Sequence, residues 1–540
     1  MKSVFSGRTI QVVRDLHPDE QWYLYQQTRQ LKEALRNGGD VSRFRLNNPD
    51  LGMYLFFMED STRTKESFRN AGKFHGVKLN DFDAKNSSFQ KKESITDTIK
   101  MLVGYSSSSS IFVVRSRIEG VCRWLEGSMA EYAAKIGVPQ PAFINAGDGR
   151  HEHPTQEFLD EFSFLEQLEW KRDHIHIALV GDLFHGRTVH SKVDGLEVFR
   201  EVQVDLIAPP ELAMPEHYLE TMKSKGFELR IFESIDEYLA QDKQAPIWYF
   251  TRLQLERMGE KLLNKAERLR RSVTFRRDHL DMVDESLRFY HPLPRHSETP
   301  TIPTFLDSLP LNRWDEQSMN GYLTRVIELA MVGGRLGSDY AGSTVRTPEY
   351  TDDFIQEATR ESSAKPDFKV GIKPVQKGIV IDHIAKGKSP EEIWDQITKI
   401  RRTLDLNSMG SHGVFPSFKE GSYKGIISLP EHKMPGEKKM KMLSAISPGV
   451  TLNLIEEHEV IEKYRLSTPP RVYRLPGLRC KNEACVSNPD HHEPIFADFI
   501  RSGENQFTCH YCETPHLFSE VWRKRVTGRH LNYRYTVSHA

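Results

Sequence analysis

The sequence contains no long hydrophobic run. Among its 540 residues, the longest uninterrupted apolar stretch is LGMYLFFM, at positions 51–58. A helix that spans a bilayer needs about 20 such residues. The first ten residues, MKSVFSGRTI, also lack the apolar centre of a secretory signal peptide. These two absences predict a cytoplasmic protein without a membrane segment.

The sequence also has no excess of one charge sign, because 74 Lys and Arg residues stand against 75 Asp and Glu residues. This balance gives no general attraction to nucleic acid or to an anionic membrane. We therefore predict neither as a partner, and we expect function to reside in local sites. A chain of 540 residues is too long for one core and predicts three or four domains.

Cysteine is scarce, with five residues, and four of them fall between positions 480 and 512. The spacing is Cys480-x4-Cys485 followed by Cys509-x2-Cys512, which forms two close pairs that can converge. In a cytoplasmic chain such crowding indicates a metal rather than disulfides. Four thiolates complete the tetrahedral shell of zinc and leave no position for a reactant. We predict one structural zinc per chain.

Three other residues bear on this prediction. His491 and His492 lie inside the cysteine segment and are the candidate substitute ligands. Cys122 lies far outside it and is expected to be a buried apolar side chain.

The first 310 residues alternate short apolar runs with amphipathic stretches. The runs include MYLFFM (53–58), IFVV (111–114), IHIALV (175–180) and IWYF (247–250), and most are followed by polar residues, glycine or proline. Parallel strands that are buried on both faces have this pattern. Ligands of such sheets bind at the carboxyl ends of the strands. We predict an α/β part here.

The pattern changes after residue 337. WDEQSMNGYLTRVIELAMVGGRLG (314–337) predicts a helix, and the polar stretch that follows it predicts a linker. Beyond the linker, segments such as KGIISL and VTLNLIEEHEVIEKYRL alternate apolar and polar residues, as a half-exposed antiparallel sheet does. SPEEIWDQITKIRRTL (389–404) predicts an amphipathic helix. We predict an α+β domain, followed by the cysteine unit.

Three hydroxyls and an arginine follow the run MYLFFM. They are Ser61, Thr62, Arg63 and Thr64, in the stretch DSTRTKESF. Ser and Thr cap helices, so capping alone explains the hydroxyls. Hydroxyls, a guanidinium and the N–H groups at a helix start also bind phosphate. This motif by itself leaves both interpretations open.

Other strand ends carry similar groups. His153 lies in HPTQ, Arg187 in GDLFHGRT, and Arg252 with Gln254 in TRLQLER. HPLPR (291–295) places two prolines after a strand, where backbone carbonyls are left to accept hydrogen bonds. The structural alternatives are a surface arginine, a buried histidine and a stiff turn.

Together these strand ends offer cations, hydroxyls and a histidine, without a paired carboxylate base. This set is typical of a site for anionic small molecules rather than of a hydrolase with a nucleophile and a base.

The motifs STRT, HPTQ, GDLFHGRT, TRLQLER and HPLPR give residues 1 to about 335 a resemblance to the catalytic chain of aspartate carbamoyltransferase. GIVIDHI, VTLNLIEEHEVIEK and the four cysteines make residues from about 368 to 526 similar to the regulatory chain of that enzyme. The protein therefore resembles a natural fusion of two chains. The resemblance implies two parallel-sheet α/β domains, followed by an α+β regulatory domain and a small zinc-binding β domain.

The implied domain organisation follows the chain in order. It comprises a carbamoyl phosphate-binding domain (1–150), an aspartate-binding domain (151–310), the C-terminal helix of the catalytic part (311–337), a linker (338–367), a regulatory nucleotide-binding-like domain (368–467), a zinc domain (468–526) and a tail (527–540).

The resemblance implies that the carbamoyl group of carbamoyl phosphate is transferred to the amine of L-aspartate. The products are N-carbamoyl-L-aspartate and phosphate, in an early step of de novo pyrimidine biosynthesis. No catalytic cofactor is implied. A homo-oligomer built on a catalytic trimer is implied, with a mobile loop that reaches the neighbouring subunit's site.

The resemblance also assigns roles to residues of this sequence. The phosphate would be held by Ser61, Thr62, Arg63 and Thr64, and the carbamoyl oxygen by Thr64, Arg115 and His153. Gln156 would bind the carbamoyl amide. Aspartate would be bound by Arg187, Arg252 and Gln254 and by the backbone carbonyls of Leu293 and Pro294. The neighbouring subunit would supply Ser87 and Lys91, with Lys92 as the alternative lysine.

The regulatory part is expected to bind a nucleotide such as ATP, CTP or UTP. The positions that match the family's nucleotide contacts are Asp382, His383, Lys441, Asn453, Ile455, Val460 and Lys463. The chain departs from the family at His458, where tyrosine is common, and in an insertion near 386–420.

Two alternative functions remain to be weighed. Ornithine carbamoyltransferase shares the phosphate motif, but it has a Cys-Leu-Pro stretch where this chain has Pro292-Leu293-Pro294. A non-catalytic nucleotide sensor would be expected to have lost site residues, and here the motifs are intact. A zinc-ribbon protein that binds nucleic acid fits neither the neutral charge nor the length of the chain.

Overall fold

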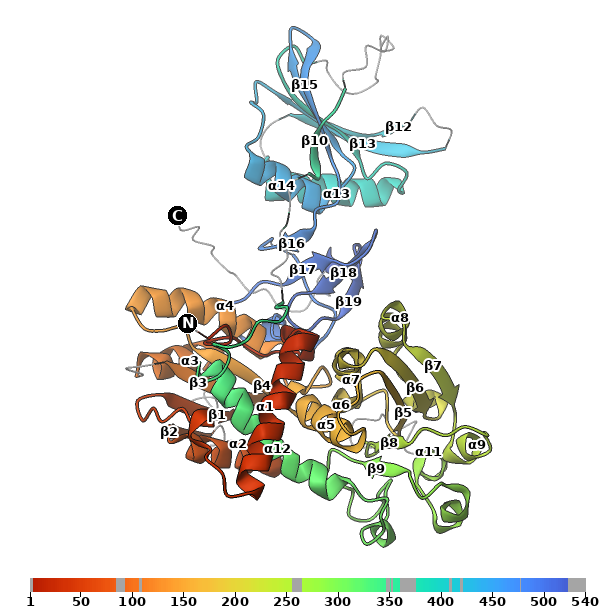
Figure 1. Ribbon diagram of the computed structural model, residues 1–540. Helices are drawn as coiled ribbons and strands as arrows, with labels where there is room; N and C mark the ends of the chain where they lie inside the picture. The colour runs from red at the N-terminus through yellow and green to blue at the C-terminus, as the bar shows by residue number, and fades with distance from the viewer. Residues whose placement is uncertain are drawn as a thin grey trace. The chain divides into compact units, whose positions relative to one another are not determined.

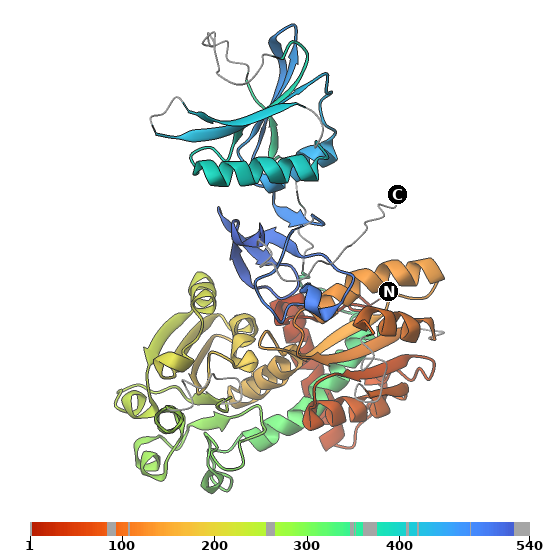
Figure 2. The same ribbon diagram turned by 180° about the vertical axis from the view of Figure 1, so that it is seen from behind.

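The computed structural model describes residues 3–522 except 84–92, 106–108, 255–264, 346–349, 351–352, 360–374, 407–409, 418–420 and 476. The chain divides into two compact units. The first comprises Met1–Arg346 with Asn482–Ile495 and Tyr511–Glu513, and the second comprises Thr347–Lys481 with Phe496–His510 and Thr514–Ala540. Figures 1 and 2 show the elements of each unit from opposite sides.

The first unit begins with a parallel sheet in the order β2-β1-β3-β4. Its strands are β1 (Gly52–Phe57), β2 (Lys78–Asp83), β3 (Ser110–Ser116) and β4 (Ala142–Asp148). The helices between them are α2 (Thr62–His75), α3 (Ile95–Gly104) and α4 (Val121–Ile136). Every residue of β1, β3 and β4 is buried, as expected for strands that are covered on both faces.

A second parallel sheet follows in the same unit, in the order β7-β6-β5-β8-β9. Its strands are β5 (His174–Val180), β6 (Glu201–Ile207), β7 (Glu228–Phe232), β8 (Ile247–Phe250) and β9 (Arg288–Tyr290). Its helices are α6 (Arg187–His190), α7 (Lys192–Gly195), α8 (Glu216–Ser224), α9 (Ile235–Leu239) and α11 (Ala266–Val273). The prediction of two parallel-sheet α/β domains is confirmed.

Three long helices connect the two sheets of this unit: α1 (Pro18–Arg36), α5 (Pro154–Gln167) and α12 (Trp314–Val332). Helix α12 contacts α1, α2 and α5, so it packs against parts of both sheet domains (Figure 1). One continuous apolar core runs through this part, from Phe5 to Leu336. The helix predicted over 314–337 ends at Val332, where Gly333 follows as its C-cap.

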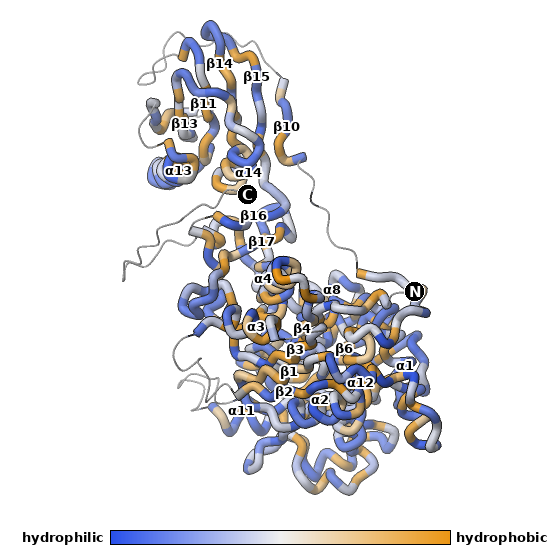
Figure 3. The backbone as a smooth tube through the Cα atoms, turned by 90° about the vertical axis from the view of Figure 1, so that its left-hand side faces the viewer, coloured by the Kyte–Doolittle hydropathy of each residue, from blue (hydrophilic) through white to orange (hydrophobic). Residues whose placement is uncertain are grey.

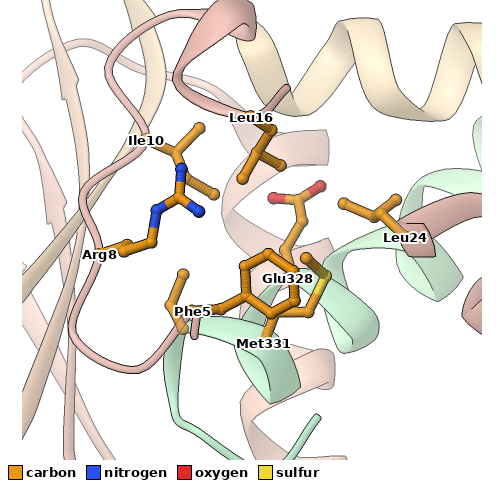
Figure 4. A pocket seen from close by; sticks show the side chains of 8 residues that line it. Phe5, Arg8, Ile10, Leu16, Leu24, Glu328 and Met331 are labelled. Atoms are coloured by element: carbon orange, nitrogen blue, oxygen red, sulfur yellow. The ribbon is translucent and has the colours of Figure 1, made fainter. Parts of the chain in front are cut away.

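A small gap in this core lies between the N-terminal segment and α12 (Figure 4). Apolar side chains line most of it, together with Arg8 and the carboxylate of Glu328. Burial raises the pKa of Glu328 to about 8, so this carboxyl is neutral at pH 7. None of the predicted substrate residues lines the gap, and we treat it as part of the core.

The second unit contains an antiparallel sheet in the order β10-β15-β14-β11-β13-β12. Its strands are β10 (Ile355–Glu357), β11 (Gly378–Ile384), β12 (Ser411–Pro416), β13 (Tyr423–Pro430), β14 (Thr451–Glu456) and β15 (Glu459–Leu466). Helices α13 (Pro390–Thr403) and α14 (Glu437–Ile446) cover one face of the sheet (Figure 1). Hydrophobic and hydrophilic segments alternate along β11, β14 and β15 (Figure 3).

Strand β10 lies inside the range 338–367, which the sequence predicted to be a linker. It pairs with β15, from Ile355 opposite Leu466 to Glu357 opposite Tyr464. The sequence pattern missed it because only three residues pair and none of them is buried.

A smaller antiparallel sheet, in the order β16-β17-β18-β19, follows in the second unit. Its strands are β16 (Arg471–Tyr473), β17 (Asp498–Arg501), β18 (Gln506–Cys509) and β19 (Pro515–Leu517). Across the part of the chain that the structure describes, no helix is both long and apolar enough to cross a membrane.

Candidate active site and metal centre

The loop between β1 and α2 carries the first group of predicted site residues. Ser61 is the N-cap of α2 in an extended conformation, yet its hydroxyl makes no capping hydrogen bond. Thr62, Arg63 and Thr64 are the first three helical residues. The N–H groups of a first helical turn have no partner within the helix, and they bind phosphate well. Capping therefore does not account for the Ser61 hydroxyl, and the anion-binding interpretation is favoured.

Arg115 and Arg187 meet at a shared carboxylate. Arg115, in β3, is 8% exposed and donates from Nη1 to the carbonyl of Ala146 at 2.9 Å. The Glu59 Oε2 atom lies 3.6 Å from Arg115 Nε and 3.4 Å from Arg187 Nη1. Arg187 opens α6 after β5, so Glu59 bridges cations from both parallel sheets.

Sequence reasoning missed Glu59. Its signal was the acidic pair Glu59-Asp60, which directly follows the apolar run and precedes the hydroxyls and the arginine. A carboxylate between two guanidinium groups can pair with both of them.

Three predicted residues converge on Gly147, at the end of β4. A Cβ atom at this position would lie 2.9 Å from Arg115 Nη1, 3.1 Å from Arg187 Cζ and 3.2 Å from His153 Cδ2. The backbone φ angle of Gly147 is +108°, a conformation that residues other than glycine rarely adopt. The structure thus brings Arg115, Arg187 and His153 together around a residue that has to be glycine.

His153 is the N-cap of α5 and is 4% exposed. Burial and then the charges of Arg115, Arg187 and Arg325 hold the pKa of His153 well below its ordinary value. The imidazole is therefore neutral at neutral pH. A neutral imidazole carries one N–H donor, which can polarise an oxygen without adding a full charge to the site.

The second sheet contributes Arg252 and Gln254, which follow β8. The Gln254 backbone N–H donates to Asp182 at 3.2 Å, and its side-chain Nε2 donates to the carbonyl of His185 at 2.9 Å. Burial and then the charges of Arg295, Arg252 and Arg63 lower the pKa of His291 to about 3. Arg63 and Arg252, which belong to different sheet domains, therefore act on the same imidazole.

The HPLPR loop is held in a defined conformation. The Leu293 N–H donates to His291 Nδ1 at 2.8 Å, and the His291 N–H donates to Gln317 Oε1 at 3.0 Å. Gln156, the third residue of α5, is 7% exposed and donates from Nε2 to Asp160 at 2.8 Å. Ser87, Lys91 and Lys92 lie outside the described residues.

Six of the seven predicted nucleotide positions lie on one sheet of the second unit. Asn453 pairs directly with Lys463, and Ile455 with Val460, across β14 and β15. Asp382 and His383 lie on the neighbouring strand β11. Lys441 lies on helix α14, where it pairs with Glu437 at 2.6 Å.

The same sheet shows a basic residue that the sequence analysis did not single out. Lys424 Nζ lies 2.8 Å from Asp382 Oδ1. His383 Nδ1 lies 3.0 Å from the Thr451 hydroxyl.

The four clustered cysteines form a candidate metal centre. Their Sγ atoms lie within 4.8 Å of one another, and all four side chains are buried. Zinc binds four thiolates in a tetrahedron with Zn–S distances of about 2.3 Å. The sulfur–sulfur distances in such a tetrahedron are compatible with the observed spacing, so the four cysteines fit zinc. His491 is not part of the cluster, and its Nε2 contacts the carbonyl of Glu483 at 3.0 Å. Cys122 is 2% exposed, and burial raises its thiol pKa well above the ordinary value.

Two cysteine-bearing segments, Asn482–Ile495 and Tyr511–Glu513, belong to the first compact unit. Glu493 accepts from the N–H groups of Ile95 and Thr96, at 2.6 and 3.1 Å, at the start of α3. Glu513 Oε2 lies 3.3 Å from His151 Nε2. These segments are therefore packed against the first sheet domain.

Known families match the chain in three places. A model described as "Aspartate/ornithine carbamoyltransferase, carbamoyl-P binding domain" matches residues 8–166, which defines the class as the carbamoyltransferases. Models of the aspartate carbamoyltransferase regulatory chain match residues 370–467 (allosteric domain) and 470–522 (metal binding domain).

Two relatives match nearly the whole chain. "Protein PyrBI" of Thermotoga maritima is 54% identical over 529 residues, which are 97% of this chain and 100% of the relative. "Protein PyrBI" of Treponema denticola is 49% identical over 97% of this chain and 100% of the relative. The chain belongs to the aspartate carbamoyltransferase family, with catalytic and regulatory parts in one polypeptide.

Solved structures agree with this assignment. Aspartate transcarbamoylase from Trypanosoma cruzi, in complex with N-(phosphonacetyl)-L-aspartic acid, is 28% identical with a TM-score of 0.52. The match covers 61% of this chain and 97% of that one. The chain is accordingly an enzyme of the aspartate carbamoyltransferase kind, and its four-cysteine cluster lies within the matched metal binding domain.

Proposed function

We propose that this protein transfers the carbamoyl group of carbamoyl phosphate to the amine of L-aspartate. The products are N-carbamoyl-L-aspartate and phosphate, in an early step of pyrimidine biosynthesis. The observation that carries the proposal is the convergence of Arg115, Arg187 and His153 on Gly147, where the carboxyl ends of two parallel sheets meet. The likeness to an aspartate transcarbamoylase solved in complex with N-(phosphonacetyl)-L-aspartic acid supports it.

Carbamoyl phosphate is assigned to the first sheet domain. Its phosphate is bound at the start of α2 by Ser61, Thr62, Arg63 and Thr64, with help from Arg115. The carbamoyl oxygen accepts hydrogen bonds from Thr64, Arg115 and neutral His153. Donors that are already aimed at the oxygen stabilise the negative charge that develops on it during attack, and each is typically worth about 2.7–4 kcal/mol of barrier.

L-Aspartate is assigned to the second sheet domain. Arg187 takes its α-carboxylate, while Arg252 and Gln254 take the side-chain carboxylate. The carbonyls of Leu293 and Pro294 orient the amine. Two anionic substrates repel each other in water, so most of the catalytic effect lies in holding them together in the correct orientation. The amine then attacks the carbamoyl carbon directly, and phosphate leaves.

A side-by-side assay tests the proposal. Purified protein is incubated with carbamoyl phosphate and either L-aspartate or L-ornithine, and the carbamoylated product is measured. We expect carbamoyl-aspartate and at most traces of citrulline. Turnover of ornithine instead, or turnover of neither amine, would contradict the proposal, and the second outcome would favour the non-catalytic nucleotide sensor.

The active site is proposed to be shared between subunits of a homo-oligomer built on a catalytic trimer. In this arrangement Ser87 and Lys91 reach the neighbouring subunit's site. Inactive Lys91→Ala and inactive Arg63→Ala proteins are mixed under conditions that exchange subunits. We expect some activity to return, because a mixed trimer contains sites with neither substitution. Verified exchange without recovery would refute the shared site.

The regulatory domain is proposed to bind ATP, CTP or UTP through its seven matched positions, in a cytoplasmic enzyme. Adjacent strands place Asn453 beside Lys463, which supports a site for a base together with phosphates. Calorimetric titration with each nucleotide tests the proposal. We expect Lys463→Ala to weaken binding, whereas the control Lys438→Ala on helix α14 leaves it unchanged. Equal binding by both variants would refute the assignment.

A further inference from the structure

Helix α5 carries a buried charged cluster that the proposed reaction does not use. The side chain of Lys192, in α7, is 0% exposed, and its Nζ lies 2.5 Å from Glu157 Oε2 and 2.9 Å from Asp160 Oδ2. The side chains of Glu157 and Asp160 are 0% exposed as well. The ammonium also lies 4.4 Å from the ring centroid of Tyr249. Burying so much charge is costly unless each group is paired, so its position beside the substrate site calls for an explanation.

Asp160 connects this cluster to the substrate site through two amides. Gln156 Nε2 donates to Asp160 Oδ1 at 2.8 Å, and Gln317 Nε2 donates to the same oxygen at 2.6 Å. An ionised carboxylate only accepts hydrogen bonds. Each amide must therefore turn its NH2 group toward Asp160 and its oxygen away.

The oxygens of these amides have different tasks. The Gln317 oxygen accepts from the His291 N–H at 3.0 Å, and His291 in turn holds the N–H of Leu293. Gln156 was assigned to the carbamoyl amide, and its oxygen is the end that can accept from an NH2 group. The Asp160 carboxylate is thus linked both to Gln156, assigned to carbamoyl phosphate, and to the loop that contains Leu293, assigned to aspartate.

Lys192 supplies the positive charge of this cluster. Burial lowers the pKa of Lys192, but the carboxylates of Asp160, Glu157 and Glu161 outweigh it and raise that pKa above its ordinary value. Burial raises the pKa of Glu157 and brings that of Glu161 to about 7. The lysine therefore stays cationic at neutral pH. Asp160 accepts hydrogen bonds from three donors, namely Lys192 Nζ, Gln156 Nε2 and Gln317 Nε2, and the one to the ammonium is the strongest kind.

We propose that Asp160, paired with Lys192, is a positioning residue that makes the enzyme select an acyl phosphate with an NH2 group. It does so by presenting the oxygen of Gln156, and not its NH2, to the substrate. This inference rests on the proposed function, from which it takes the role of Gln156. Acetyl phosphate, which has a methyl group in place of the NH2, loses this hydrogen bond and is discriminated against.

The test is Asp160→Asn, which has the same shape but can donate as well as accept. The Gln156 amide is then free to turn over. We expect kcat/KM for carbamoyl phosphate to fall about tenfold to a hundredfold, the range for leaving a buried donor without its hydrogen-bond acceptor. The inhibition constant of acetyl phosphate against carbamoyl phosphate should change little. We define the discrimination ratio as the preference for carbamoyl phosphate, measured by kcat/KM, over acetyl phosphate, measured by its inhibition constant. This ratio should fall by about tenfold or more, an effect that mere loss of stability does not produce.

Two matched controls separate positioning from burial. Glu157→Gln changes the other carboxylate beside Lys192, and Asp205→Asn changes a different carboxylate that is also 0% exposed. Neither touches Gln156 among the described contacts, so both should keep the wild-type ratio. A folded Asp160→Asn protein with the wild-type ratio would overturn the inference, as would an equal loss of ratio in Asp205→Asn.

A second variant covers the case in which Asp160→Asn does not fold. Lys192→Met removes the ammonium that holds Asp160 Oδ2 at 2.9 Å, so the carboxylate is no longer fixed against Gln156, and we expect the same fall in the ratio. A wild-type ratio in Lys192→Met would count against the inference. The wild-type enzyme is assayed first: lack of carbamoyl transfer by that protein would refute the proposed function, whereas unchanged ratios in the variants of an active enzyme would refute only the inference.

Discussion

The catalytic part and the metal-binding module (residues 470–522) are stabilised in different ways. The catalytic part has one apolar core from Phe5 to Leu336, with large side chains such as Trp248, Trp314 and Tyr25 fully buried. The module contains four strands of three or four residues each and a central group of four cysteines. Apolar burial at about 25 cal/mol per Å² can hold the first together, whereas the second depends on metal.

The two larger sheets also differ in where they place polar side chains. In the catalytic part all strands of a sheet run in the same direction, so their carboxyl ends meet, and Arg115 and Arg187 reach a common carboxylate there. In the regulatory sheet neighbouring strands run in opposite directions, and Asn453 and Lys463 meet in mid-strand. Strand direction therefore decides whether a ligand is expected at the carboxyl ends of the strands or in the middle of the strands.

The largest effect is expected from removing a zinc ligand. Cys509→Ser should abolish zinc binding and unfold the module, because metal binding contributes on the order of 10 kcal/mol in small zinc modules. Catalytic turnover should largely remain, since the catalytic part has its own core. Zinc content and turnover are measured together, with Cys122→Ser as the control that keeps zinc. Full zinc occupancy would refute the ligand set. Loss of both zinc and turnover in an intact catalytic trimer would refute the idea that turnover does not depend on the zinc module.

The opposite result is expected from Arg63→Ala, which should lose activity and keep its folded structure. Loss of this phosphate contact should lower kcat/KM for carbamoyl phosphate by about a hundredfold to a thousandfold, equivalent to about 2.7–4 kcal/mol. The melting temperature should not change, because Arg63 is exposed. Arg69→Ala is the control on the same helix, where Arg69 pairs with Glu66 at 2.9 Å. Activity near that of the wild type would refute the assignment.

A narrower effect is expected from Arg252→Ala. The KM for aspartate should rise and kcat should fall, because the lost contact also orients the attacking amine. A combined change of about tenfold to a hundredfold in kcat/KM corresponds to one hydrogen bond to a charged group. The KM for carbamoyl phosphate should change little. Arg268→Ala, which removes a surface ion pair with Glu211, is the control. Unchanged aspartate kinetics would remove Arg252 from the site.

The smallest effect concerns acid stability of the catalytic part. Burial, partly offset by the hydrogen bond to the Val326 carbonyl, lowers the pKa of His75 to about 4 in the folded protein, against about 6.5 unfolded. The unfolded chain therefore binds the proton more readily, so stability is lost as pH falls from about 6.5 toward 4. The contribution is at most about 1.4 kcal/mol per pH unit.

Melting curves of the catalytic part between pH 7 and pH 5 check this expectation. His75→Gln should flatten the dependence, whereas the exposed His458→Gln should not. An equal slope in wild type and His75→Gln would contradict it.

Much of the fold followed from local patterns. Runs such as IHIALV are buried along almost their whole length, because parallel strands covered on both faces have to be apolar throughout. The cysteine spacing was sufficient to predict the metal ligands, since two close pairs need only one chain reversal to converge. Strand β10 escaped prediction because its three residues are stabilised by pairing with β15 and not by their own pattern.

The sequence alone determined which chemical groups are available: hydroxyls and an arginine after one strand, cations after others, and four clustered thiols. Only the tertiary structure decided which of them meet. It placed Glu59 between Arg115 and Arg187, brought His153 against Gly147, and joined Lys192 through Asp160 to Gln156. These partners are far apart in the chain or lie on different elements. Their contacts depend on how sheets and helices pack, and hydrophobic patterns along a sequence carry no information about that geometry.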